Sequence, residues 1–482
     1  MSRLKALFVL TVVLVLAVTP IQVWAVKPES KLLKGAYRID TNGWHYVHLE
    51  GDPYQIGYQH GYLLADNLDV SWKACIHVYW SENYFGDWWY AAREISDKYI
   101  LPWLIKDYPE IWSEIRGIAD GVEAKGYQGW DALDIVAFNA WADIDAYWDL
   151  WETETLHSKG EHISLSHIEK GCSAFIATGS YTVDGEIVIG HNTWAGYAGD
   201  GYWNVIFDLK PENGHRIVYQ STGGCIWSGQ DWIYNDAGLM VCETTLPGMG
   251  TYNVDGIPVF VRIRNAMQYG STIDDFIDIM TDNSNGAYSN EWLIGDAKTS
   301  EICSLQLGCY KWDIERTYDG FITSCNYPKG PGVRSETTFN WHTPWTSSYC
   351  RNERWNELKA YYTAHPHSID CSVGMAFLSD HKDMWTGAVD ASSRTLCGHC
   401  EAETNVRPGD LPDPSGAYDG KVTCSSLVLS KMGMWGRWGH PCGTPFDASV
   451  FLDLHPEYEW QSFYLHDIPE TSVPWTYFTR DM

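Results

Sequence analysis

The spacing of apolar residues divides the chain into a helical first part and a strand-rich second part. Between Tyr54 and Trp151, apolar residues recur at intervals of three and four, as in 95–105 and 111–124. This periodicity predicts four or five amphipathic helices. The stretch 152–170 that follows is polar and has the composition of a linker. The helical part is therefore expected to end near Trp151 and the linker to extend to residue 170.

Short runs typical of β-strands begin directly after the linker. The first two, 173–178 and 186–190, are separated by a segment that contains Asp184-Gly185, a dipeptide common in hairpin turns. Further strands are predicted at 205–209, 216–220, 238–245, 292–296 and 302–307, with helical periods at 255–280 and 351–364. The pattern predicts an α+β fold in which a layered, strand-rich unit follows the helical region.

Composition excludes some classes of protein. The 482 residues carry 33 Lys and Arg against 62 Asp and Glu, a formal charge of −29, and no basic run occurs. Nucleic acid is therefore not an expected partner, because phosphate contacts need a basic surface. Hydrophobic residues make up 45% and aromatic residues 15% of the chain, which is enough to form a large core and excludes general disorder.

The first residues resemble an export signal. Arg3 and Lys5 precede an apolar run at 7–18, Pro20 follows, and Val23-Trp24-Ala25 offers a small-residue cleavage site. An uncleaved anchor is the alternative, but the apolar run is shorter than the roughly 20 residues that span a bilayer. We expect a cleaved signal peptide at 1–25, no stable membrane anchor, and a secreted or extracytoplasmic protein.

The chain contains 13 cysteines, and an odd number in an exported protein leaves at least one thiol without an intramolecular partner. Cys397-Gly398-His399-Cys400 has spacing of the kind found in metal sites, and only His440-Pro441-Cys442 could complete a zinc-binding set. Disulfides or buried free thiols explain the cysteines more simply. The sequence therefore predicts no metal site.

Cys172 occupies the junction between the polar linker and the first strand. If the bond between Gly171 and Cys172 were cut, the new α-amine, with a reference pKa of about 7.7–8.0, would lie within reach of its own thiol. It could then accept the thiol proton without a separate histidine, as in enzymes with an N-terminal nucleophile. The alternative from position alone is that Cys172 forms half of a disulfide.

Five sequence blocks over about 250 residues resemble those of the phospholipase B-like proteins, a family of N-terminal-nucleophile hydrolases, and of the related penicillin acyltransferase group. The blocks are Gly171-Cys172-Ser173-Ala174, Gly190-His191-Asn192-Thr193-Trp194, Gly238-Leu239 through Glu243-Thr244-Thr245, Asn290-Glu291-Trp292-Leu293-Ile294 with Asp296, and Asp419-Gly420-Lys421-Val422-Thr423. The run from Gly51 to Leu64 is more similar to the acyltransferase group. The resemblance implies an αββα sandwich, autoproteolysis before Cys172 and a thiol nucleophile.

The resemblance also implies roles for individual residues. Cys172 would attack an ester or amide carbonyl and form a thioester, while its α-amine serves as base. His191 and Asn192, at the end of the predicted hairpin, could orient the amine or contact substrate; His191 could instead be a structural imidazole. Trp194 would be a pocket wall or a core residue.

Donors for the developing oxyanion are expected on a strand end and in a turn. Thr244 or Thr245 occupies the position of an oxyanion-hole side chain in related enzymes, where asparagine is more usual. Asn326, before a proline-containing turn, is a second candidate. Arg394 and Lys421 could bind an anionic group of the substrate or form exposed salt bridges.

These features together predict a signal peptide at 1–25, a helical segment at 26–171 and a catalytic domain at 172–482. The expected activity is hydrolysis of acyl esters on a lipid or another small molecule that bears an acyl chain, without metal or organic cofactor. An N-acyl amide hydrolase or acyltransferase is the alternative within the same chemistry. A non-catalytic extracellular binding module is the alternative from another class.

Overall fold

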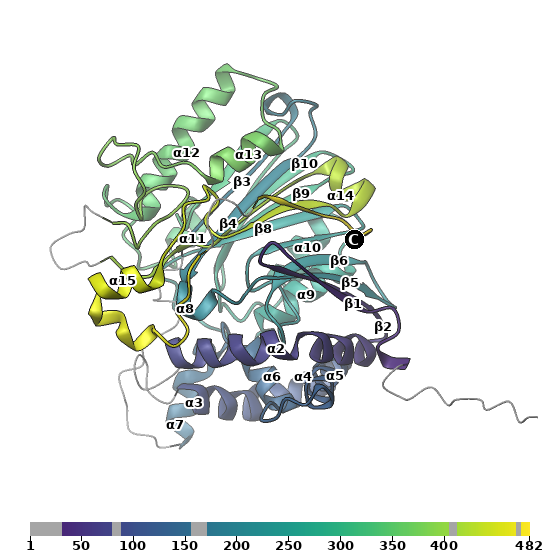
Figure 1. The fold of residues 1–482 in the computed structure, drawn as a ribbon. Helices are drawn as coiled ribbons and strands as arrows, with labels where there is room; N and C mark the ends of the chain where they lie inside the picture. The colour runs from purple at the N-terminus through teal and green to yellow at the C-terminus, as the bar shows by residue number, and fades with distance from the viewer. Residues whose placement is uncertain (1–30, 80–87, 156–170, 404–411, 469–473) are drawn as a thin grey trace, which may run out of the picture.

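The computed structural model describes residues 31–79, 88–155, 171–403, 412–468 and 474–482. Within these ranges two β-sheets lie face to face, and helices cover their outer faces (Figure 1). The α+β class predicted from the sequence is confirmed, and the layers follow the αββα order. The predicted signal peptide and residues 156–170 of the predicted linker lie outside the described residues. Among the described helices, none combines the length and the apolar character needed to cross a bilayer.

The larger sheet has nine described strands. All neighbouring strands are antiparallel except β2 and β5, which are parallel. In spatial order the strands are β1 (Tyr37–Thr41), β2 (Trp44–Gly51), β5 (Val205–Pro211), β6 (Ile217–Ser221), β7 (Trp232–Asn235), β8 (Leu239–Thr245), β9 (Asn290–Asp296), β10 (Glu301–Leu307) and β11 (Trp312–Thr317).

The smaller sheet contains the hairpin that begins with Cys172. Its spatial order among the described strands is β12 (Gly320–Ser324), β3 (Cys172–Thr178), β4 (Val188–Gly196), β14 (Asp419–Cys424), β15 (Met434–Trp438) and β16 (Thr476–Phe478), and β13 (Ser415–Ala417) pairs with the end of β4. Strand β4 runs through His191, Asn192 and Trp194, beyond the predicted end at residue 190. These three residues therefore belong to a strand and have positions fixed by its register.

Strands β3 and β4 are central to the core. Strand β3 packs against β8 and β9 of the facing sheet, and all seven of its residues are buried. On its other face, Phe175 contacts Trp355 and Phe377 of the covering helices at ring-centroid distances of 6.0 and 5.2 Å. Burial on both faces explains why the sequence here is a continuous apolar run without polar alternation.

Helices α12 and α13 cover the smaller sheet at the top of Figure 1, while α2, α9 and α10 contact the larger sheet. The described helices are α2 (Pro53–Tyr79), α3 (Trp88–Ile95), α4 (Leu101–Asp107), α5 (Pro109–Lys125), α6 (Ala132–Asn139), α7 (Trp148–Thr155), α8 (Tyr197–Asp200), α9 (Val259–Tyr269), α10 (Ile273–Thr281), α11 (Pro331–Arg334), α12 (Ser347–Ala364), α13 (Cys371–Leu378), α14 (Ser425–Lys431) and α15 (Ala448–Leu454). A π-helical turn joins α3 to α4 at Ser96–Ile100, and 3₁₀ turns occupy Ile144–Tyr147, Gly179–Tyr181 and Pro456–Gln461.

The segment before Cys172 is not purely helical, which corrects the sequence prediction. Strands β1 and β2 precede the helices, and β2 enters the larger sheet beside β5. The Asn42-Gly43 turn between β1 and β2 is a local hairpin signal that the prediction overlooked. The parallel pairing of β2 with β5 has no such signal, because its partner lies about 160 residues further along the chain. The N-terminal segment thus completes the sheet of the predicted catalytic domain.

A buried carboxylate connects the N-terminal strand to the rest of the sheet. Asp208 of β5 accepts hydrogen bonds from the Tyr46 hydroxyl at 2.8 Å and from His48 Nδ1 at 2.7 Å, both on β2. It also accepts a hydrogen bond from Arg216 Nε at 2.6 Å. These neighbours hold the pKa of the Asp208 carboxyl below its usual value although burial alone would raise it. The Asp208 charge is therefore paired with Arg216, just before β6, and hydrogen-bonded across β2 and β5.

Helices α2 and α5 approach each other closely because glycines line their contact. A Cβ atom added to Gly57 or Gly61 would lie 1.9 or 2.0 Å from a backbone carbonyl oxygen of α5. Gly117 and Gly121 of α5 face α2 in the same way, each 2.3 Å from a carbonyl oxygen. Both helices carry the glycines four residues apart, so they align on one face of each helix.

We expect Gly61→Ala to lower the free energy of unfolding by about 1–3 kcal/mol, because the helices must separate to admit the methyl group. A denaturant titration of the full chain measures this change. Gly250→Ala is the matched control, since a Cβ atom there meets nothing within 4 Å. Equal stability of the two variants would contradict the close packing of α2 on α5.

Candidate active site

The side chain of Cys172 lies at the start of β3 and is 1% exposed. In the sheet register Cys172 pairs with Thr193 and Ala174 with His191, so the side chains of Cys172 and His191 share one face. Burial, followed by the carboxylates of Asp231 and Glu243, raises the pKa of the Cys172 thiol well above its usual value. The thiol of the continuous chain is therefore protonated at neutral pH.

The peptide bond between Gly171 and Cys172 is held from both sides. The Trp194 backbone N–H donates to the carbonyl oxygen of Gly171 at 2.8 Å. The Cys172 backbone N–H donates to Oδ1 of Asn326 at 2.8 Å. A Cβ atom on Gly171 would lie 2.4 Å from the Trp194 ring, so only glycine fits before the cysteine. The carbonyl oxygen faces a fixed donor, which is the arrangement that stabilises developing negative charge.

Hydrogen bonds from both its backbone and its side chain fix the orientation of Asn326. It adopts a left-handed conformation with φ of 60° after β12. Its Nδ2 donates to the Thr245 carbonyl at 2.8 Å, and its backbone N–H donates to Thr244 Oγ1 at 3.1 Å. The two threonines thus hold Asn326 in place, and the Asn326 oxygen faces the amide of Cys172. Sequence reasoning expected oxyanion donors at these three positions; in the continuous chain the Gly171 carbonyl instead contacts the Trp194 N–H.

Arg351 of α12 belongs to the site, and the sequence did not identify it. Its guanidinium donates to the Cys172 carbonyl and, at 3.1 Å, to Asn326 Oδ1. It also stacks over the Trp194 ring at 4.2 Å and is 1% exposed. In the sequence this arginine is an ordinary charged residue on a predicted helix, so only the packing of α12 against β3 brings it to the site.

Asn192 organises the main chain beside the nucleophile. Its Oδ1 accepts hydrogen bonds from the Ser173 backbone N–H at 2.9 Å and from Trp194 Nε1 at 3.1 Å. Its Nδ2 donates to the Leu396 carbonyl at 2.9 Å. These contacts join β3, β4 and the segment around residue 396, so the Asn192 side chain is engaged within the protein.

His191 lies beside the thiol on the inner face of the sheet. Single side-chain atoms of Cys172, His191 and Asp231 all lie within 4.8 Å of one another, and all three residues are buried. Burial, followed by the positive charge of Lys421, lowers the pKa of His191 well below its usual value. A neutral imidazole is a proton acceptor, so His191 has the protonation state of a general base.

The two cations predicted to bind an anionic substrate group are both buried in ion pairs. Lys421 is fully buried; its Nζ lies 2.9 Å from Asp419 and donates to Thr193 Oγ1 at 2.7 Å. Arg394 lies 2.9 Å from Asp383 and 3.1 Å from Glu403. Lys421 therefore influences the site through its charge, and Arg394 crosslinks the segment that follows α13.

Aromatic side chains adjoin Cys172 on the side of Asp231. The Tyr288 hydroxyl donates to Asp231 at 3.2 Å, and its ring lies 5.3 Å from Trp141 and 6.1 Å from Trp227. Trp141 follows α6, so the N-terminal segment contributes to this wall. Nothing in the sequence marked Asp231 or Tyr288 as residues of the site.

Comparisons with known proteins agree with the resemblance seen in the sequence. The family profile for phospholipase B matches residues 41–307. The match includes Cys172, His191 and Thr245 and ends before Asn326 and Arg351. It also begins inside the N-terminal segment, so both sides of residue 171 belong to it.

An uncharacterized protein of Archaeoglobus fulgidus is 25% identical over 60% of this chain and 48% of its own length. The phospholipase B-like protein F of Dictyostelium discoideum is 27% identical over 40% of this chain and 37% of its own length. The chain thus spans less than half the length of these two relatives. Among solved structures, a mutant conjugated bile acid hydrolase of Clostridium perfringens aligns at 13% identity over 55% of this chain and 89% of its own, with a TM-score of 0.34.

We expect the pKa of His191 in the folded protein to lie below the value near 6.5 at which an exposed histidine titrates, because burial and the charge of Lys421 disfavour the protonated imidazole. Because the unfolded state binds this proton first, the contribution of His191 to stability is lost as the pH falls below 6.5. NMR of the full chain with ¹³C-labelled histidine measures this titration, and the His191→Gln variant assigns the resonance. A midpoint at or above the value of about 6.5 expected for an exposed histidine would refute the prediction.

Proposed function

Because the chain belongs to the phospholipase B family, we propose that it is a hydrolase that becomes active when the bond between Gly171 and Cys172 is cut. The mature enzyme then cleaves acyl esters through a thioester on Cys172. The observation that carries this proposal is the peptide bond held between Trp194 and Asn326, with a buried thiol on its C-terminal residue. The remaining steps are assigned to the residues around that bond.

Self-cleavage begins when Cys172 Sγ attacks the Gly171 carbonyl carbon. The neutral imidazole of His191 accepts the thiol proton, and the Trp194 N–H stabilises the oxyanion. The C–N bond breaks, the proton passes to the departing nitrogen, and the acyl group is now a thioester on Cys172. Water hydrolyses this thioester, which leaves a carboxylate on Gly171 and a free thiol beside a free α-amine on Cys172.

The new α-amine is the general base of the mature enzyme. Asn326 Oδ1, which accepts the Cys172 N–H in the continuous chain, is placed to accept a hydrogen bond from this amine. Arg351 donates to the same oxygen and to the Cys172 carbonyl, so it fixes the residue without acting on substrate. The amine takes the thiol proton as Sγ attacks the ester, and then protonates the departing alcohol.

Two features bear on the proposed substrate. The aromatic wall of Trp141, Trp227 and Tyr288 adjoins the nucleophile and offers an apolar surface for an acyl chain. The chain carries a net charge of −29, which disfavours binding to anionic membranes. We therefore propose monomeric, micellar or zwitterionic lipids as substrates, with N-acyl amides as the alternative within the same chemistry.

The segment before Cys172 stays bound after the cut in this proposal. Strand β2 pairs with β5, Asp208 joins them by buried hydrogen bonds, and Trp141 forms part of the aromatic wall. Removing the segment would expose the open edge of β5 and this core surface.

Export through the signal at 1–25 also remains part of the proposal.

The wild-type protein is expected to appear in denaturant as two fragments, the second beginning at Cys172, that co-elute under native conditions. Cys172→Ala should yield one continuous, inactive chain, because the attacking sulfur is missing; Cys172→Ser should also lack hydrolysis. Intact mass and N-terminal sequencing measure the cut. Cys371→Ser, which replaces a partly exposed cysteine in α13, should be cut like the wild type. Active enzyme that is uninterrupted across residues 171 and 172 would rule out the proposal.

Hydrolysis of zwitterionic vesicles or mixed micelles should decrease as anionic lipid is added, since the acidic protein is repelled. Release of fatty acid measures activity, and added salt should reduce the difference because it screens the charge. Activity that rises with anionic lipid content would contradict the proposed substrate preference. A parallel panel of acyl amides decides between ester and amide hydrolysis without altering the assignment of Cys172.

A further inference from the structure

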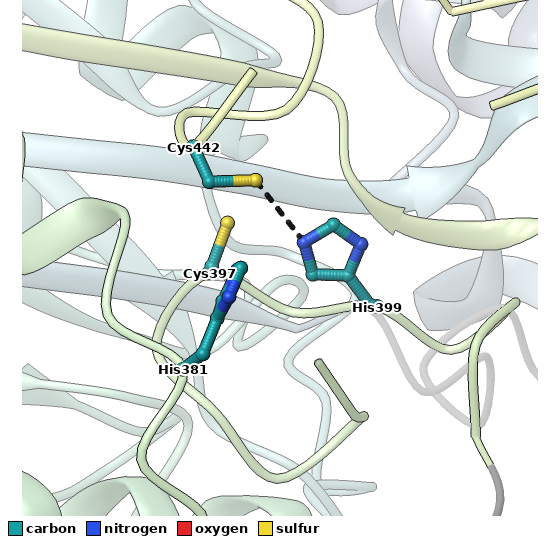
Figure 2. Close-up of side chains that lie close together, drawn as sticks. All are labelled: His381, Cys397, His399 and Cys442. Atoms are coloured by element: carbon teal, nitrogen blue, oxygen red, sulfur yellow. Dashed lines mark hydrogen bonds between the residues drawn. The ribbon is translucent and has the colours of Figure 1, made fainter. Parts of the chain in front are cut away.

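Two cysteines and two histidines converge at a second place in the molecule. Figure 2 shows His381, Cys397, His399 and Cys442 with their side chains turned toward a common point. One ligand atom from each lies within 4.8 Å of the other three. The Cys442 Sγ and His399 Nε2 atoms are 3.5 Å apart. Distances of this size separate the corners of a tetrahedron of sulfur and nitrogen ligands around one metal ion.

The four residues come from segments without regular secondary structure. His381, Cys397 and His399 lie between α13 and β13, whereas Cys442 follows β15. Cys397 is fully buried and His399 is 1% exposed. The segment is further crosslinked by Arg394, which pairs with Asp383 and Glu403. A long irregular segment with its polar groups inside needs such crosslinks because it has few backbone hydrogen bonds of its own.

The neighbours of His399 leave one of its nitrogens available as a ligand. His399 Nδ1 lies 2.7 Å from Glu401 Oε1, and Glu401 also accepts a hydrogen bond from the Tyr197 hydroxyl at 2.7 Å. A proton on Nδ1 fixes the tautomer in which Nε2 carries a lone pair toward the sulfur of Cys442. A carboxylate behind a histidine ligand is the usual second contact of a metal site.

We propose that His381, Cys397, His399 and Cys442 bind one zinc ion as a closed structural site. Two cysteines and two histidines satisfy the four positions that zinc prefers, and their soft donors disfavour magnesium and calcium. This proposal replaces the sequence expectation of no metal. The sequence pointed to the segments Cys397 to Cys400 and His440 to Cys442, but the cluster in the structure contains His381 and does not contain Cys400. The cluster lies beyond residues 41–307, so the family match does not include it.

The site connects to the candidate active site through residues next to its ligands. The Leu396 carbonyl accepts the hydrogen bond from Asn192, and a Cβ atom on Gly398 would lie 2.2 Å from the Trp194 ring. The metal therefore fixes the segment that covers Trp194. This role is structural, and it holds whether or not the chain is a hydrolase.

Metal analysis of the full-length chain, purified without chelator, tests the site. The wild type should contain about one zinc ion per chain, and Cys397→Ser and Cys442→Ser should lose most of it. Cys400→Ser is the matched control, since Cys400 is close in sequence and outside the four ligands; it should keep its zinc. Folded Cys397→Ser or Cys442→Ser protein that retains the full zinc content would overturn the proposal.

A second experiment needs no variant to fold. Zinc is removed from the wild type with a strong chelator, and Co²⁺ is added; absorption bands of a tetrahedral, thiolate-bound Co²⁺ ion support the site. The apoprotein should also unfold at a lower temperature than the zinc form. A wild type without metal in which peptide mass analysis finds Cys397 and Cys442 joined in a disulfide would refute the proposal.

Discussion

The amide group between Gly171 and Cys172 is the point on which the geometry of the site depends. Its carbonyl oxygen and its N–H are both bound by groups of the neighbouring strand and turn, Trp194 on one side and Asn326 on the other. Asn326 is itself oriented by the end of β8, and Trp194 is covered by Arg351. A buried amide with both of its polar atoms satisfied cannot rotate freely, so a reaction there meets donors and acceptors that are already in place.

The same arrangement assigns different tasks to the two faces of the hairpin formed by β3 and β4. The face toward the larger sheet carries Cys172 and His191, and burial together with the charge of Lys421 lowers the pKa of the imidazole. The opposite face carries Asn192, which ties the hairpin to the irregular segment after α13. In the proposed mechanism the reacting groups thus lie on one face and the supporting contacts on the other, which follows from the alternation of side chains along a strand.

The sequence allowed good predictions of many elements with a local signal. The hairpin after the linker and most strands of the larger sheet follow from short patterns, and Cys172, His191 and Asn192 lie on that hairpin, while their catalytic roles stay predictions. Residues that reach the site through long-range packing were missed, as Asp231 and Arg351 show. Strand β2 was missed for a different reason: its hairpin with β1 turns at Asn42-Gly43, a local signal that was overlooked, and only its parallel pairing with the distant β5 had no local signal. The roles suggested for Arg394 and Lys421 assumed free cations, whereas an acidic chain supplied each with a carboxylate partner.

The insertion of β2 beside β5 has a consequence for how the proposed cut protein would behave on denaturation. While the chain is continuous, this parallel pair forms within one molecule, and the connection keeps the two strands at a high effective concentration. Once residues 171 and 172 are separated, the sheet consists of two polypeptides, and its reassembly becomes a second-order process that slows on dilution. Recovery of the native sheet would then depend on how much protein is present, and the cut molecule would persist because of the height of its unfolding barrier.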